Sequence, residues 1–564
     1  MPVSPRQALD FEPFSRFGSY LSLSRLTHHK RPHFGPGLYL RQHHGVQFAV
    51  RELALVLLDG QVPESEWDAT RLTLRAPGGS GQVEIIFDGT DALRLRGRGV
   101  SLTLCFPPAY HASMYPARGG DWEINSRGSA SKMLLHVLAG KLEALTDWQG
   151  EASEKIEARL SADTPEGEWE LALEHFHGTW TPRTYSPFEE VEAATRAEFS
   201  EWLAKIPEAS PDLADARARA AYVNWSSTVR PHGHFRRHAM LMSKNHMDFV
   251  WSWDHAFNAM AHMRGAPDFA WDQMMLMADR QDIHGAFPDQ QNDGIEHFSF
   301  CKPPIHGWAL GKLRAMRPDF FDAPRLREAL SWLEPWTRWW LNHRVWEDGG
   351  LPYYLHGNDS GWDNSTFFLK GVPVLTPDLP CFLVLQCREL AAIHRILGQN
   401  VDAQFWSTQA DQLRAAVLSE LWNGERFVAK HLPSGEFVEA DTLIETIPLV
   451  LGEELPKDIR EKVVARLHRY LTPHGLATEW PESPYYTPDG YWRGPIWAPS
   501  TFLIVDGLRR GGESALADDI AKRFLRMCAA SGFAENFDAL SGAPLRDKAY
   551  TWTSSVFLLL ASGR

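Results

Sequence analysis

The chain has 564 residues, enough for about two to four domains. Its 57 basic and 71 acidic residues give a formal charge of −14 at pH 7, so we expect neither nucleic acid nor an anionic membrane as a partner. Hydrophobic residues make up 44% and charged residues 23%, which is typical of globular proteins and excludes a disordered chain. The 23 tryptophans indicate either a large core or a surface that stacks on flat, hydroxylated ligands.

The cellular compartment is predicted from what the sequence does not contain. The first residues include neither an apolar stretch nor a small-residue cleavage site, and no apolar run is long enough to span a bilayer. The five cysteines are odd in number and scattered, which argues against a disulfide framework and for a reducing compartment. We therefore expect a cytoplasmic protein.

The first third of the chain predicts strands. Short segments with period-two alternation follow one another and are separated by clusters of Gly, Pro and Asp, a pattern typical of a β-sandwich. This predicts a β-rich N-terminal domain over residues 1–187. The expected strands are Arg71–Arg75, Gln82–Phe87, Ala92–Arg96, Val100–Leu104, Ile156–Leu160 and Glu168–Leu173.

The rest of the chain predicts helices. Residues 188–211 form a charged linker helix, and residues 212–564 form a helical domain with apolar residues at i, i+3 and i+4. Long loops rich in Trp, Asp, Asn, Gly and His separate the helices, and such loops are usually functional. The clearest helices are Asp212–Val229, Arg325–Trp340, Pro380–Leu397, Ala403–Trp422, Ile459–Leu471, Trp497–Leu508, Ala515–Ala530 and Tyr550–Leu560.

One loop, Leu351–Phe368, concentrates polar and aromatic groups. Asp359, Trp362, Asp363 and Asn364 lie within six residues of one another. Carboxylates and amides bind sugar hydroxyls and an indole stacks on a sugar ring, so the loop fits a sugar site. The same residues favour an Asx-rich turn, and both interpretations stay open.

Two earlier segments carry similar groups. Trp253 and Asp254 precede a predicted helix, where Asp254 can be an N-cap, a sugar contact or both. Asp289 and Gln290 belong to a segment that resembles a broken calcium loop, but the ligand order and the terminal Glu of that loop are missing. We therefore expect hydroxyl contacts from these side chains, and no metal.

Two later segments complete the set. Tyr491, Trp492, Arg493 and Trp497 stand at the entrance to a helix, and core packing explains one of these tryptophans more easily than two. Glu535 lies in a loop between two predicted helices, where a carboxylate considered alone is usually only solvated.

Together, Asp363 and Glu535 offer the two carboxyl groups that glycoside hydrolysis needs, one to protonate the leaving oxygen and one as base or nucleophile. A separation of about 6.5–9.5 Å predicts inversion and about 5–5.5 Å predicts retention. The acid must keep its proton near neutral pH, and burial or a neighbouring like charge would raise its pKa.

The segments SWDHAF, DSGWDNS, YWRGPIW and AENFDALSG, in this order, resemble glycoside hydrolase family 63 and its trehalase-like relatives. The resemblance implies an α+β multidomain chain. In it, the β-sandwich-like domain is followed along the sequence by an (α/α)6 toroid, the fold of the six-hairpin glycosidases. It implies inversion, with Asp363 as general acid and Glu535 as general base, and no cofactor. It places subsite residues at Trp253, Asp254, Trp362, Asn364, Trp492 and Trp497.

The resemblance leaves the substrate open. We expect an α-glucosidase-like enzyme on an α-linked oligosaccharide or glycoside; the alternatives are a trehalase and a hydrolase of mannosyl- or glucosyl-glycerate. Arg493 and His306 are candidates for holding a glycerate carboxylate. The oligomeric state does not follow from the sequence.

Two hypotheses come from other classes of protein. One is a sugar epimerase or isomerase, since helical toroids host such reactions; it would need a pair of histidines as acid and base. The other is a non-catalytic carbohydrate-binding barrel, which is disfavoured because both carboxylates are present. The histidine candidates for the first are His246, His255, His284 and His306.

Overall fold

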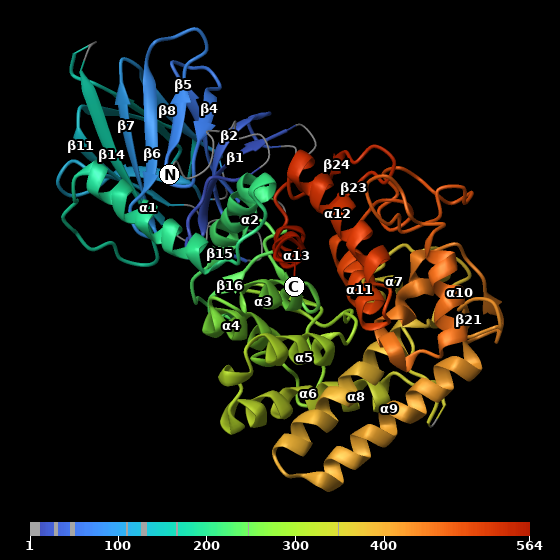
Figure 1. The fold of residues 1–564 in the computed structure, drawn as a ribbon. Helices are drawn as coiled ribbons and strands as arrows, with labels where there is room; N and C mark the ends of the chain where they lie inside the picture. Colours follow the sequence, from blue (N-terminus) through green and yellow to red (C-terminus); the bar gives the residue numbers. More distant parts are fainter. Residues whose placement is uncertain are drawn as a thin grey trace. The chain divides into compact units, whose positions relative to one another are not determined.

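The computed structural model (Figure 1) describes residues 12–27, 32–45, 51–108, 111–125, 132–164, 167–245, 247–347 and 349–563. The chain forms two compact units. The first comprises Met1–Ala204, Ala221–Asp248 and Asn292–Ile295, and the second comprises Lys205–Ala220, Phe249–Gln291 and Glu296–Arg564. Both units thus contain more than one stretch of chain, whereas the sequence predicted an uninterrupted domain over residues 212–564.

The first unit contains two antiparallel sheets. The six-stranded sheet has the order β1 (Leu21–Leu26), β2 (Gly37–Gln42), β3 (Glu52–Leu58), β8 (Leu102–Phe106), β13 (Ser153–Ser161), β12 (Lys141–Trp148). The eight-stranded sheet has the order β4 (Glu64–Trp67), β5 (Leu72–Arg75), β6 (Gln82–Phe87), β7 (Ala92–Arg98), β14 (Glu168–Phe176), β11 (Lys132–Ala139), β10 (Trp122–Asn125), β9 (Ser113–Pro116).

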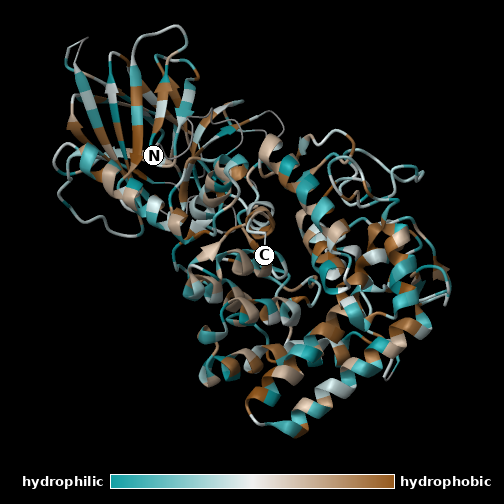
Figure 2. Ribbon diagram, viewed as in Figure 1, coloured by the Kyte–Doolittle hydropathy of each residue, from teal (hydrophilic) through white to brown (hydrophobic). Residues whose placement is uncertain are grey.

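Alternating side chains explain these strands, and Figure 2 shows the corresponding bands of teal and brown along them. In β6, Val83 and Ile85 are buried while Gln82 and Glu84 are half-buried. This strand has the predicted bounds, and β5, β7, β8, β13 and β14 match their predictions to within a few residues. β14 is central because β7 and β11 pair with its two edges.

The predicted linker corresponds to helix α1 (Phe188–Lys205) and a short 3-10 turn, η2 (Pro211–Leu213). Helix α2 (Ala214–Ser227) follows, and then the strand pair β15 (Thr228–Val229) and β16 (Ala239–Met240). By its contacts, α1 belongs to the first unit up to Ala204. Its buried side chains include Phe199 and Trp202. Helix α1 is therefore a packed part of the first unit and not only a linker between the two units.

The second unit is a closed ring of helices. Each of six consecutive inner segments contacts the next, and α13 contacts α3, which closes the ring. The inner segments are α3 (Asp254–His262), α5 (His306–Met316), α8 (Asp378–Ile396), η5 (Leu443–Glu454), α11 (Ala498–Arg510) and α13 (Thr551–Ala561). Outer helices are α4 (Pro267–Ala278), α6 (Ala323–His343), α9 (Asn400–Glu420), α10 (Lys457–Leu467) and α12 (Ser514–Ser531).

Short elements fill the loops between these helices. They are the strands β17 (Val250–Trp251), β18 (Gln290–Gln291), β19 (Glu296–His297), β20 (Val374–Leu375), β21 (Ala429–His431), β22 (Phe437–Val438), β23 (Asn536–Phe537) and β24 (Pro544–Leu545), and the turns η3 (Pro318–Phe320), α7 (Gly357–Ser360) and η4 (Thr366–Phe368). In the described part of the chain, no helix combines the length and apolar character needed to cross a bilayer.

Helix α6 shows how local signals set an outer helix. Asp322 is its N-cap, and the carboxylate accepts a hydrogen bond from the Arg325 N–H at 3.0 Å. An N-cap of this kind contributes about 1 kcal/mol. Trp332, Trp336 and Trp340 recur at helical spacing and are each 2% exposed or less, as the pattern predicted.

Helices α4 and α5 had no such signal. α4 buries seven of the side chains in its twelve residues, including Trp271, Gln273 and Met274, and so lacks the polar stripe that reveals a surface helix. α5 begins at His306, directly after two prolines and Ile305. Because α5 is one of the inner segments of the ring, its apolar residues are not confined to one face, and their helical spacing is not visible in the sequence. The amphipathic pattern therefore did not reveal helices that other elements cover on most sides.

Candidate functional site

Two glycines set the course of the loop that carries Asp363. Gly361 has φ = 71°, and a Cβ there would lie 2.5 Å from the Trp253 ring. A Cβ on Gly357 would lie 1.9 Å from the Asp363 carbonyl oxygen. A side chain at either position would push this loop away, so the glycines hold Asp363 in place.

Asn364 joins this loop to the segment Gly490–Arg493. Its side-chain N–H donates to the Gly490 carbonyl at 3.0 Å, and its side-chain oxygen accepts from the Trp492 N–H at 2.9 Å. Arg493 Nε donates to the Asn364 carbonyl at 2.6 Å. Asn364 and Arg493, both predicted as substrate contacts, thus bind the two loops to each other.

Tyr491 contacts one of the two predicted catalytic carboxylates and feels the charge of the other. Its hydroxyl donates to Asp363 Oδ2 at 3.0 Å. Burial raises the pKa of Tyr491 far above its usual value, and the charges of Asp363 and Glu535 raise it further. The residue has φ = 64°, and its carbonyl accepts from Trp497 Nε1 at 2.8 Å. The structure therefore places Asp363 in contact with Tyr491 and Glu535 near enough for its charge to act on the same phenol, although the two carboxylates are far apart in the sequence.

Glu535 follows α12 and precedes β23. Its backbone N–H donates to the Asp547 carbonyl at 2.7 Å, and Ile496 and Phe537 exchange backbone hydrogen bonds that connect its loop to the one carrying Tyr491. The residue is 6% exposed. Burial raises the pKa of Glu535 to about 8; Asp547 and Asp363 add to the rise, and Arg546 opposes it.

A buried ammonium group balances the acidic side of the site. Lys302 Nζ lies 3.1 Å from Asp289 Oδ1 and donates to the Asn358 carbonyl at 2.6 Å. Burial opposes its charge, but Asp289, Asp363 and Asp254 outweigh burial and raise the pKa of Lys302. Asp254 begins helix α3 without capping it, since Trp253 occupies the N-cap position. Burial raises the pKa of Asp254 well above its usual value.

Lys302 is the residue that sequence reasoning missed. It stands alone between Cys301 and Pro303, with no acidic neighbour in sequence to mark it. Its three carboxylate neighbours come from other segments, so no local pattern indicated it. Gln290, predicted beside Asp289, pairs in strand register with Trp251 and His297 and is half-buried.

The predicted tryptophans form a buried stack. Trp492 and Trp497 are parallel, with ring centroids 4.0 Å apart, and Trp362 lies 4.8 Å from Trp492. Trp253 lies 6.3 Å from Trp492, and all four rings are 2% exposed or less. These indoles, which come from three separate segments, therefore pack against one another, and their role as sugar subsites stays a prediction.

Asp359 is also placed differently from the prediction. It is fully buried, and its oxygens are held by Arg344 Nη1 at 2.9 Å and by the N–H groups of Leu355 and Cys301 at 2.9 and 3.1 Å. With those oxygens bound by the chain itself, Asp359 stabilises the loop and is not presented to a substrate.

The histidine candidates that the structure describes differ in their burial. His255 and His306 have ring centroids 5.2 Å apart, but both are buried, and His306 Nδ1 accepts from Trp336 Nε1 at 3.1 Å. Burial lowers the pKa of His255 to about 4 and that of His306 well below its usual value. A neutral buried His306 is unsuited to hold a glycerate carboxylate. His284 is exposed, and His246 lies outside the described residues.

Comparison with known proteins identifies the helical unit. Residues 247–553, more than half of the chain, match the family described as "Mannosylglycerate hydrolase MGH1-like glycoside hydrolase domain". The mannosylglycerate hydrolase of Rubrobacter radiotolerans is 25% identical over 404 residues, which cover 55% of this chain and 89% of that protein.

Two solved structures share the fold. The family 63 mannosylglycerate hydrolase of Thermus thermophilus, solved with glucose, has a TM-score of 0.55 and 21% identity over 62% of this chain and all of that chain. A bacterial glucoamylase complexed with acarbose has a TM-score of 0.65 and 11% identity over 99% of this chain and 94% of that chain. The predicted β-sandwich-like region followed by an (α/α)6 toroid is confirmed.

The family match also decides between the classes of protein left open above, in favour of a glycosidase over an epimerase or a binding barrel. The chain belongs to the family of mannosylglycerate hydrolase MGH1-like glycoside hydrolases and is a glycoside hydrolase.

Proposed function

We propose that the protein is an inverting α-glycosidase that hydrolyses an α-linked oligosaccharide or glycoside, with Asp363 as general acid and Glu535 as general base. The supporting observation is that Asp363 accepts a hydrogen bond from Tyr491 while Glu535, from a distant loop, is close enough for its charge to act on the same phenol. Asp363 protonates the leaving oxygen, while Glu535 removes a proton from the water that attacks the opposite face of the sugar.

The surroundings of the two groups suit these roles. Glu535 is buried, and a raised pKa makes a carboxylate a stronger base toward water. Tyr491 holds Asp363 Oδ2, which leaves Oδ1 to carry the proton toward the glycosidic oxygen. Lys302 places a positive charge near Asp254, Asp289 and Asp363, and so reduces the repulsion among these carboxylates.

The experiment that tests this proposal follows the anomer released first. We expect proton NMR of an α-glucoside hydrolysed by the purified protein to show the β-anomer of glucose before mutarotation. Release of the α-anomer would mean retention and would overturn the mechanism. The substrate set should include maltose-type disaccharides, trehalose and mannosyl- and glucosyl-glycerate.

The rise in the pKa of Glu535 predicts a pH profile. The general base acts in its ionised form and the general acid in its protonated form, so kcat/KM should be bell-shaped in pH, with one limb near pH 8 set by Glu535. Asp547→Asn removes a charge that raises the pKa of Glu535, so the limb of the pH profile that Glu535 sets should move to lower pH. A profile that Asp547→Asn leaves unchanged would contradict the assignment of this limb to Glu535.

Tyr491→Phe tests the positioning of Asp363. The ring can keep its contact with Trp497, whereas the hydrogen bond to the carboxylate is lost. A hydrogen bond contributes about 0.5–1.5 kcal/mol, so kcat should fall about 2–10-fold with KM little changed. A change in KM alone would assign Tyr491 to substrate binding instead.

A second candidate substrate is mannosylglycerate, because the family and the Rubrobacter relative carry that name. Arg546 is the cation to test for holding the glycerate carboxylate. Its guanidinium lies 4.8 Å from the Tyr491 ring centroid and 2.8 Å from Asp489 on its exposed side. Arg546→Met should then raise KM for mannosylglycerate and leave KM for a neutral α-glucoside unchanged. Equal effects on both substrates would favour the neutral glycoside.

A further inference from the structure

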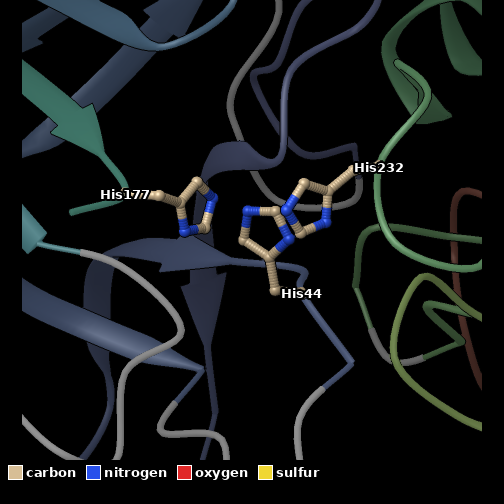
Figure 3. A group of neighbouring side chains, drawn as sticks. All are labelled: His44, His177 and His232. Atoms are coloured by element: carbon tan, nitrogen blue, oxygen red, sulfur yellow. The ribbon is translucent and has the colours of Figure 1, made fainter.

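Three histidines of the first unit converge at the ends of strands from both sheets. His44 follows β2 of the six-stranded sheet, His177 follows β14 of the eight-stranded sheet, and His232 lies between β15 and β16. One ligand atom from each lies within 4.8 Å of the others. Figure 3 shows the three imidazole rings approaching one another from separate segments.

A buried carboxylate orients two of these rings. Asp293 Oδ2 lies 2.6 Å from His44 Nδ1 and 2.8 Å from His232 Nδ1, and the Gly45 N–H donates to Oδ1 at 2.7 Å. Asp293 contacts both rings through Nδ1, so Nε2 of each ring is the atom left to bind a ligand.

The second observation is an unpartnered nitrogen. The His44 side chain has no exposed surface, and its Nε2 makes no hydrogen bond. The ring stacks on Tyr20 with centroids 4.0 Å apart, and this contact limits its rotation. A buried basic nitrogen without a partner is costly unless a ligand satisfies it.

From these contacts we infer that His44, His177 and His232 bind one divalent transition-metal ion, with zinc as the best match, and that Asp293 is the outer-shell carboxylate that orients two of the ligands. Neutral imidazoles suit zinc, and carboxylate–histidine–zinc arrangements are common. Three protein ligands leave a fourth tetrahedral position for water, which fits the exposed position of His177.

The geometry requires one adjustment. Two nitrogens bound to tetrahedral zinc at about 2.0–2.1 Å lie about 3.3 Å apart, closer than the 4.8 Å limit of the present cluster. His177 now stacks on His232 with ring centroids 4.9 Å apart, and its exposure allows it to rotate onto the ion. The ion would then fasten a strand end of each sheet to the segment that carries His232.

The sequence contains no signal for this site. Its ligands are separated by more than a hundred residues in one case, and no pair has the spacing of a zinc motif. The sequence-based expectation of no metal therefore followed from the absence of a local pattern.

The test uses the full chain, freed of metal by a chelator and titrated with Zn²⁺ alone. We expect one tight site per chain and a higher thermal midpoint on zinc addition. Co²⁺, used as a probe, should give the visible absorption of a tetrahedral site. His177→Gln should remove the site without disturbing the buried network, and Asp293→Asn should weaken zinc binding about 10–100-fold. The matched control, His468→Gln, replaces an exposed histidine of the second unit and should bind zinc like the unmodified chain.

Two outcomes would overturn the inference. One is the absence of stoichiometric zinc binding in the unmodified chain. The other is zinc binding that is the same in His177→Gln and in the unmodified chain. A lower thermal midpoint of His177→Gln that persists without metal would assign His177 to packing. Glycosidase turnover is a separate measurement, so a failed metal test leaves the proposed function untouched.

Discussion

Glu535→Gln and Asp363→Asn will each reduce turnover of an α-glycoside by about 10²–10⁴-fold, because general acid–base catalysis contributes an effect of this size. Both amides keep nearly the shape of the acid but can neither deliver the proton that cleavage needs nor take one from water. Steady-state kinetics on the purified variants, with circular dichroism to confirm folding, measures the loss. Glu482→Gln replaces an exposed carboxylate of the same unit and should retain normal turnover.

The two variants should differ when the leaving group changes. An aryl glycoside with an electron-withdrawing substituent departs without a proton, so Asp363→Asn should recover much of its activity on it. Glu535→Gln should not recover, since attack by water still lacks its base. Azide, which needs no base, should rescue Glu535→Ala and form a glycosyl azide of inverted configuration. Rescue of the Glu535 variant by the leaving group alone would show that the roles are exchanged.

Lys302→Met will destabilise the helical unit by about 3–5 kcal/mol, because removing one partner of a buried ion pair leaves an uncompensated charge. Lys302 and Asp289 have side chains 7% and 8% exposed, and Lys302 also faces Asp254 and Asp363. Methionine fills a similar volume, so the effect reports the lost charge and not a cavity. Chemical denaturation followed by tryptophan fluorescence measures the shift.

Two further variants separate the lost charge of Lys302 from general effects of the substitution. Lys457→Met removes an 80% exposed ammonium 3.7 Å from Glu461 and should cost less than about 1 kcal/mol. The double variant Lys302→Met with Asp289→Asn should be more stable than the single one, because the orphaned carboxylate is gone. Equal losses for Lys302→Met and Lys457→Met would contradict a buried pairing role.

Asp363 and Glu535 were chosen from the motifs as the two carboxyl groups, and their catalytic roles stay predictions. In the structure Asp363 accepts a hydrogen bond from Tyr491, and the charges of both carboxylates act on that phenol. The four tryptophans predicted as subsite residues are buried in the structure. Their burial of 98% or more comes from stacking between residues as distant as Trp362 and Trp492. Asp359 was misjudged for a related reason, because its partner Arg344 and its backbone donors are not visible in the motif.

By itself the sequence determined most of the strands and helices in this protein, because side-chain alternation and helical spacing are properties of near neighbours along the chain. Strand β6 and helix α6 are examples. Its choice of Asp363 and Glu535 as the catalytic pair stays a prediction. Only the tertiary structure decided which polar groups are charged, paired or inaccessible. The carboxylates near Lys302 and the histidines near His44 come from segments that are far away in the sequence. Burial and pairing depend on such distant contacts, and local spacing does not record them.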